Sequence, residues 1–239
     1  MRSLVAVLVK VVLVGTAAVC GLFPGAAGAE GAAGVGAMPG AVLAPVGVGA
    51  IVRPYERSGL RLVSRLTDGA GRAVGGADVE VLQKVVGEAR WEEVGAVVTR
   101  PDGVVVAVVP PGPSRLVDLA YGPLIGGGFG AQAEVFETVD AGLSMRASTG
   151  RTGPEGAVTL EGRVFGRVPA GGVVVEVLVY YQGVWEPIRT PRSDRLGRVR
   201  VAYRFHRAFG RFPFRLRVRR GQAGFPYGDG LSRWVEVDT

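Results

Sequence analysis

Apolar and polar residues alternate along most of the chain from residue 60 onward, and turn residues separate the alternating runs. A period of two residues is typical of strands that bury one face, and no helical period competes with it. The pattern predicts strands over 60–67, around Val79 and Val81, and over 91–99, 103–109, 115–121 and 131–138. It predicts a second series near 141–148, 157–165, 173–181, 185–190, 198–206, 211–219 and 231–238. We therefore expect an all-β protein.

One β unit occurs twice in this sequence. The repeated residues are Gly-Gly-x-x-Val-Glu-Val-Leu at 75–82 and 171–178, Trp-Glu-x-[Val/Ile] at 91–94 and 185–188, and a glycine twelve residues after each Trp, at Gly103 and Gly197. About seven short strands in each copy, with turn signals between them, are typical of a β-sandwich. The sequence thus predicts two tandem sandwiches, over 52–138 and 139–239.

Residues 1–29 are typical of a secretory signal peptide. Arg2 supplies the positive start, Val11 to Phe23 form the apolar run, and Ala27-Gly28-Ala29 is a cleavage site before Glu30. Lys10 interrupts the apolar stretch, which leaves it shorter than the about 20 residues of a membrane span. Two alternatives stay open: an uncleaved membrane anchor and a lipid anchor at Cys20.

Residues 30–51 are mostly Gly, Ala, Val and Pro and are predicted to be a flexible linker. If the signal is cleaved, Cys20, the only cysteine, leaves with it. The mature chain then has no disulfide, no thiol nucleophile and no transmembrane span. The expected location is secreted or at the cell surface.

Positive charge is concentrated late in the chain. Residues 189–220 contain twelve Arg and one acid, Asp194. Alternation places one arginine row on each of two successive strands, opposite apolar rows, and a turn at 207–210 would make the strands a hairpin with both rows on one solvent face. We name six of these residues as candidates for binding an anionic polymer: Arg198, Arg200, Arg204, Arg215, Arg217 and Arg219.

The two halves of the chain carry net charges of opposite sign. Residues 139–239 carry a net charge of +8 and residues 30–138 one of −3. A positive face suits an anionic envelope polymer or an acidic polysaccharide. The bland interpretation is a solvated strand face whose charges discourage edge pairing. Opposite charges would also permit head-to-tail association, although the oligomeric state is unknown from sequence.

Trp91 and Trp185 occupy matching positions of the repeat. Regular alternation turns both rings outward, where they could stack on sugars, whereas a bulge would turn them inward. Trp at the start of a strand more commonly covers a core or an edge. The two residues are therefore candidates for sugar stacking, with a structural role as the alternative.

Other chemistry finds little support in the sequence. His206 is the only histidine, and no Gly-x-Ser-x-Gly motif is present for a nucleophile. The aspartates in Gly-containing turns stand alone rather than in a calcium-loop series. We expect no catalytic residue, no cofactor and no metal. Nucleic acid is not expected either, because no aromatic series interleaves the arginines on their face.

The turn and core motifs resemble known β-sandwich families. In the first copy, Leu66 to Leu82, Arg100-Pro-Asp-Gly103 and Val109-Pro-Pro-Gly112 look like a carboxypeptidase-regulatory-like or prealbumin-like domain. In the second copy, Asp194-Arg-Leu-Gly-Arg198, Tyr203-Arg-Phe205 and Gly224-Phe-Pro-Tyr227 are similar to immunoglobulin-like repeats of secreted bacterial surface proteins. The resemblance covers roughly 55–239. It implies tandem immunoglobulin-like or prealbumin-like sandwiches, and it does not imply peptidase activity.

Together these features favour a non-enzymatic, exported binding or structural protein of the cell surface or the extracellular space. A passive spacer without a ligand is the first alternative. A hydrolase of unknown type, built from groups distant in sequence, is the second.

Overall fold

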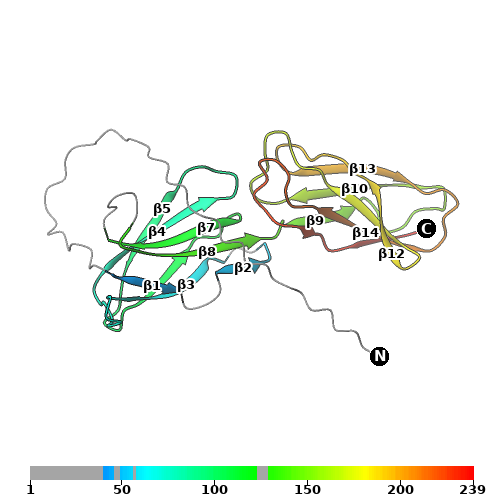
Figure 1. Cartoon of the computed structure of the whole chain (residues 1–239). Helices are drawn as coiled ribbons and strands as arrows, with labels where there is room; N and C mark the ends of the chain where they lie inside the picture. Colours follow the sequence, from blue (N-terminus) through cyan, green and yellow to red (C-terminus); the bar gives the residue numbers. More distant parts are fainter. Residues whose placement is uncertain (1–39, 46–48, 56–57, 123–128) are drawn as a thin grey trace, which may run out of the picture. The chain divides into compact units, whose positions relative to one another are not determined.

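The structure is a computed structural model that describes residues 40–45, 49–55, 58–122 and 129–239 (Figure 1). The predicted signal peptide, Cys20 and much of the predicted linker lie outside the described residues. Every regular element of the described part is a β-strand. None of the described residues belongs to a helix that is long and apolar enough to cross a membrane.

The first eight strands form two sheets. A three-stranded sheet has the order β1 (Val42–Pro45), β3 (Leu60–Thr67), β6 (Val104–Val109), and a five-stranded sheet has the order β2 (Ala50–Arg53), β8 (Ala131–Val139), β7 (Arg115–Tyr121), β4 (Asp78–Val85), β5 (Glu92–Val98). Neighbouring strands are antiparallel except for β2 and β8, which are parallel.

The last eight strands repeat this arrangement. One sheet has the order β13 (Arg198–Arg204), β10 (Ala157–Val164), β9 (Leu143–Ala147), and the other has the order β12 (Val184–Arg189), β11 (Glu176–Tyr181), β14 (Arg211–Val218), with β15 (Gly230–Leu231) and β16 (Val235–Asp238) both beside β14. A single parallel bridge between Arg151 and Asp238 takes the place of the β2–β8 ladder.

Each pair of sheets closes over its own apolar core, because alternate side chains of every long strand turn to the same side. In β8 the odd-numbered residues are buried and the even-numbered ones are mostly exposed. One core is built around Val79, Val105 and Val117, and the other around Val177, Phe214 and Leu216. The prediction of an all-β protein with tandem β-sandwiches is confirmed.

The predicted linker, residues 30–51, includes residues that belong to strands β1 and β2. Leu43 on β1 is buried in the first core, and Val42 pairs with Thr67 of β3. Ala50 on β2 pairs with Phe136 of β8. Both strands have only four residues, so their own alternation is too short to be recognised. The strands beside them in the sheets hold them in place, and that information is not local.

The repeat in the sequence is also a repeat in register. Leu82 on β4 lies opposite Asp118 on β7, and the matching Leu178 on β11 lies opposite Arg215 on β14. Neither leucine belongs to a core cluster, although Leu178 is fully buried and Leu82 half-buried. Asp118 and Arg215 therefore occupy equivalent positions on the outer faces of the two larger sheets.

Candidate functional site

The two predicted arginine rows lie on different sheets. β13 pairs with β10, and β14 pairs with β11 and β16, so the expected β13–β14 hairpin is wrong. Phe205 is fully buried after β13, and the segment that follows it crosses to the other sheet. The Tyr203 and Phe214 rings meet across the core with centroids 5.4 Å apart. The apolar rows thus face each other, and the arginine rows point in opposite directions.

The row on β13 becomes part of a larger surface, which we call the basic patch. It is the outer face of the β9–β10–β13 sheet, and its arginines are all exposed: Arg146, Arg163, Arg198, Arg200 and Arg204. Arg146 and Arg163 come from the two neighbouring strands, and sequence analysis did not select them. The signal that would have found them is their outward position on β9 and β10.

One carboxylate shares this face with the five arginines. Glu161 on β10 accepts a hydrogen bond of 2.8 Å from Arg146 Nε and lies 3.7 Å from Arg200 Nε. Arg163 lies directly opposite Arg198 across the β10–β13 ladder. Within the described part of the chain, neither of these two forms an ion pair. Like charges at directly opposed positions destabilise a sheet, so this pair leaves positive charge uncompensated.

A shallow depression of about 740 Å³ lies on the patch. It is lined by Ser144, Met145, Arg146, Glu161, Gly162, Arg163, Arg198, Val199 and Arg200. Guanidinium groups bind phosphate and carboxylate through paired N–H donors. The surface is open and carries no buried nucleophile, so its chemistry is that of binding charged groups along a chain.

The arginines of the row on β14 bind other side chains of the same sandwich. Arg217 and Arg219 both bind the carboxylate of Glu176, Arg219 through a 3.0 Å hydrogen bond. Burial alone would raise the pKa of Glu176, but the hydrogen bonds from both arginines outweigh it and lower that pKa. The Arg215 guanidinium lies 3.9 Å from the centre of the Trp185 ring. Burial, with a smaller effect of Arg217, lowers the pKa of Arg215.

The two candidate tryptophans belong to neither core cluster. Trp91 is 39% exposed, and Lys84 Nζ lies 4.9 Å from its ring centre. Trp185 is partly buried between Arg215 on one side and the Tyr180 ring, whose centroid is 5.3 Å away. A cationic side chain thus lies near each ring, and such a cation–π contact is stabilising by itself. Sugar stacking by Trp91 or Trp185 stays a prediction.

Asp118 was missed by sequence analysis. Its side chain is 1% exposed, Oδ2 accepts a 2.8 Å hydrogen bond from Gln132 Nε2, and Oδ1 has no hydrogen-bond partner. Glu134 lies directly opposite on β8. Burial, and secondarily the charge of Glu134, raises the pKa of Asp118 to about 6. The signal in the sequence that could have identified this buried carboxylate was a single Asp between the apolar residues Val117 and Leu119.

Replacing Asp118 by asparagine should stabilise the protein at neutral pH. The folded carboxyl holds its proton up to about pH 6, whereas its ordinary pKa is 3.8. Its contribution to stability is therefore greatest below that ordinary value and is lost as the pH rises through 6. At about pH 8 we expect Asp118→Asn to raise the free energy of unfolding by roughly 1–3 kcal/mol. Urea unfolding at pH 8 and pH 4, in high salt, checks this. An equal effect at both pH values would contradict it.

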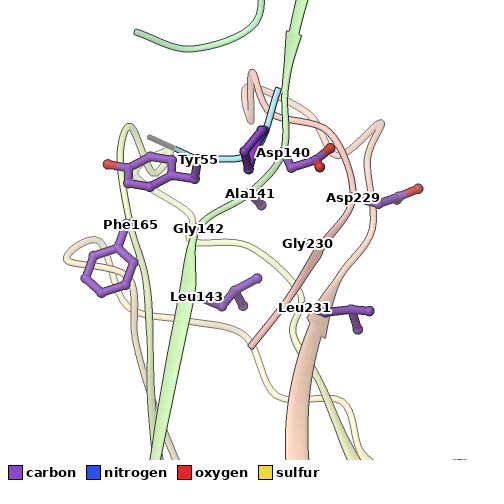
Figure 2. Close-up of a pocket in the computed structure, with 10 residues that line it drawn as sticks. Tyr55, Asp140, Ala141, Gly142, Leu143, Phe165, Asp229, Gly230 and Leu231 are labelled. Carbon is purple, nitrogen blue, oxygen red and sulfur yellow. The ribbon is translucent and has the colours of Figure 1, made fainter. Parts of the chain in front are cut away.

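A second depression, of about 630 Å³, contains two carboxylates (Figure 2). Its lining includes Tyr55, Asp140, Phe165 and Asp229. Burial, and then the charge of Asp229, raises the pKa of Asp140. Asp229 Oδ1 already accepts a 2.8 Å hydrogen bond from the Arg220 backbone N–H. Two carboxylates are too few for a calcium site, and no group of three or more potential metal ligands occurs among the described residues.

The other turn aspartates close their own turns. Asp68 Oδ1 accepts hydrogen bonds of 2.9 Å from the backbone of Ala70 and Arg72. These bonds, led by the one from the Arg72 backbone, lower the pKa of Asp68. Asp194 Oδ1 accepts a 2.7 Å hydrogen bond from the Arg198 backbone N–H. Turn chemistry is the role these contacts show.

No protein-family model matches the chain, and no curated protein matches it. The D0-D1 domain of intimin is 15% identical, with 83% of this chain and 97% of that chain covered and a TM-score of 0.32. The Yersinia pseudotuberculosis adhesin InvE is 15% identical over 83% of this chain and 58% of its own, with a TM-score of 0.36. Bovine butyrophilin is 13% identical over 83% and 98%, with a TM-score of 0.42.

Proposed function

We propose that the chain is a non-enzymatic, exported binding protein of the cell surface that docks on an anionic envelope polymer or an acidic polysaccharide through the basic patch. The observation that supports this most directly is the opposed pair Arg163 and Arg198, which no carboxylate of the described chain neutralises. A phosphate or carboxylate of the polymer would remove the repulsion between them. The signal peptide and export remain part of the proposal.

The geometry of the patch suits a polymer better than a small ligand. Neighbouring strands are about 4.8 Å apart, and alternate residues of one strand about 6.8 Å apart, so the guanidinium groups form a grid. Each exposed charge contact contributes only about 0.2–1 kcal/mol and is screened by salt. Several contacts on one chain act together, which raises the overall affinity without deep burial.

The competing proposals rest on weaker observations. A passive spacer does not require an uncompensated like-charge pair on a single face. A hydrolase would need convergent acids, and Asp140 and Asp229 are the nearest to that arrangement, in an open depression without a neighbouring nucleophile. The carboxypeptidase-regulatory-like subtype of the first sandwich also stays a proposal.

The test is co-sedimentation of the purified protein with bacterial cell envelopes at low and high salt. The patch variant carries Arg163→Ser, Arg198→Ser and Arg200→Ser. Its matched control carries Arg189→Ser, Arg220→Ser and Arg233→Ser, which remove the same charge from exposed positions outside the patch. We expect salt-sensitive binding that the patch variant loses by about tenfold or more, whereas the control stays close to the unmodified protein.

Three outcomes would change the conclusion. Equal losses in both variants would show that only net charge matters. Retained binding by the patch variant would direct attention to Trp91 and Trp185. Absence of binding by the folded, unmodified protein would favour the spacer. Soluble dextran sulfate and polygalacturonate, added as competitors, distinguish a sulfate- or phosphate-like ligand from a carboxylate one.

A further inference from the structure

The first sandwich carries a second charged surface, which we call the acidic face. It is the outer face of the five-stranded sheet β2–β8–β7–β4–β5. Its carboxylates point away from the core: Asp78, Glu80, Glu93, Asp118 and Glu134. Lys84 is the one cation among the described outward residues of these same strands.

The acidic face and the basic patch are complementary in detail. Asp118 and Glu134 lie directly opposite each other across the β7–β8 ladder, as Arg163 and Arg198 do across the β10–β13 ladder. Each is a like-charged cross-strand pair, which is unfavourable in an isolated sheet. The buried Asp118 Oδ1 also has no hydrogen-bond partner, so no donor within the described part of the chain offsets the charge on that oxygen, just as no carboxylate there pairs with Arg163 or Arg198.

We propose that the acidic face of one copy of the chain docks on the basic patch of a second copy, with the Asp118–Glu134 pair against the Arg163–Arg198 pair. The partner is a second copy because the complementary groups occur in the same pattern on this chain, with four more carboxylates than cations on one surface and four more arginines than carboxylates on the other. Contact would place the guanidinium groups beside the exposed carboxylate of Glu134, above the buried Asp118, and relieve both like-charge pairs.

Apolar groups on the acidic face support a protein partner. Phe136 and Val98 are exposed beside the carboxylates, on β8 and β5, and Trp91 precedes β5. Aromatic residues and Arg are enriched in protein interfaces. Complementary charge mainly sets the register and the rate of such an encounter, while the apolar contacts supply affinity.

The association is head-to-tail, because the two surfaces belong to different sandwiches. A heterologous contact of this kind closes into a ring or continues as an open chain of copies. It also uses the patch that binds polymer in the proposed function, so the two interactions exclude each other at any one patch. The association itself requires no polymer, and its test therefore stands or falls independently.

Sedimentation velocity of the purified protein tests the idea first. At about 10 mM salt we expect a sedimentation coefficient that increases with protein concentration, and at about 1 M salt a monomer. Association should weaken from pH 7.5 to pH 5, because Asp118 takes up a proton in that range. The charged groups beside it are Glu80 and Lys84 on β4, Glu93 on β5 and Glu134 on β8.

Charge reversal identifies the surfaces. One variant carries Glu80→Lys and Glu134→Lys, and the other carries Arg163→Glu and Arg198→Glu; all four side chains are exposed. Each variant alone should associate about tenfold more weakly or not at all. An equimolar mixture of the two should associate again, since the reversed face of one then fits the reversed patch of the other.

A control variant, Arg220→Glu with Arg233→Glu, changes net charge equally outside the patch and should leave association unchanged. Circular dichroism confirms that every variant is folded. A monomer at low salt, a mixture of folded variants that does not associate, or a control that abolishes association would overturn the proposal. Loss of envelope binding with association intact would instead reject only the proposed function.

Discussion

Replacing Glu137 by leucine is expected to lower the free energy of unfolding of the first sandwich by about 3–5 kcal/mol. Glu137 is 1% exposed; its Oε2 accepts a 2.8 Å hydrogen bond from Arg115 Nε, and its Oε1 accepts one of 3.1 Å from Arg53 Nη1. Arg115 is itself 2% exposed. Without Glu137 the guanidinium charge stays buried, and only the neutral oxygens of Gln83 and Pro110 face it.

The double variant Arg115→Met with Glu137→Leu is the control. It removes both charges, and apolar replacements of buried ion pairs are commonly neutral or stabilising by about 1–4 kcal/mol. We therefore expect it to recover most of the loss. Urea unfolding combined with hydrogen exchange of the first-sandwich amides measures the effect where it arises. A double variant no more stable than Glu137→Leu would show that lost packing, rather than the unpaired charge, explains the effect.

Replacing Gly197 by alanine should destabilise the second sandwich by roughly 3 kcal/mol. The residue has φ of +75°, which an L-residue adopts at a cost, and a Cβ there would lie 2.2 Å from the Val164 carbonyl oxygen. Gly103, its counterpart in the first copy, has φ of +76° and the same conflict at 2.5 Å with the Leu66 carbonyl oxygen. The repeated glycine thus allows the turn to pack against the strand that pairs with the next one, β3 in the first copy and β10 in the second.

Gly183→Ala separates the two causes. Gly183 has φ of +87°, but nothing lies within 4 Å of a Cβ built there. Gly183→Ala should therefore lower the free energy of unfolding only through its strained backbone conformation, by about 1–2 kcal/mol. Thermal unfolding of the two variants gives the comparison. Equal losses for Gly183→Ala and Gly197→Ala would mean that the close approach to Val164 carries no weight.

Alternation predicted the strands and the direction of each side chain well, because a period of two is a local property. Val199 and Val201 are buried and Arg198 and Arg200 exposed, as expected. The pairing of strands is not local. A hairpin and a crossing to the opposite sheet have the same alternation, and only the pairing of β13 with β10 rather than with β14 distinguishes them.

The residues that sequence analysis missed share a cause. Arg146 and Arg163 are isolated charges in their own strands and become part of a patch only when β9 and β10 lie beside β13. Arg115 and Glu137 are 22 residues apart and meet inside the sandwich. Grouping by proximity in sequence selected the charges of β13 and β14, and so separated residues that the sheet unites.

The parallel pairing of β2 with β8 has a mechanical consequence. Their ladder joins Ala50 with Phe136 and Arg53 with Val139, so tension applied before β2 and after β8 pulls the two strands past each other along their length. The slanted bonds of that ladder then bear the load together rather than opening one after another. In the second sandwich the corresponding parallel pairing is a single bridge between Arg151 and Asp238. We therefore expect the first sandwich to resist a pulling force better than the second.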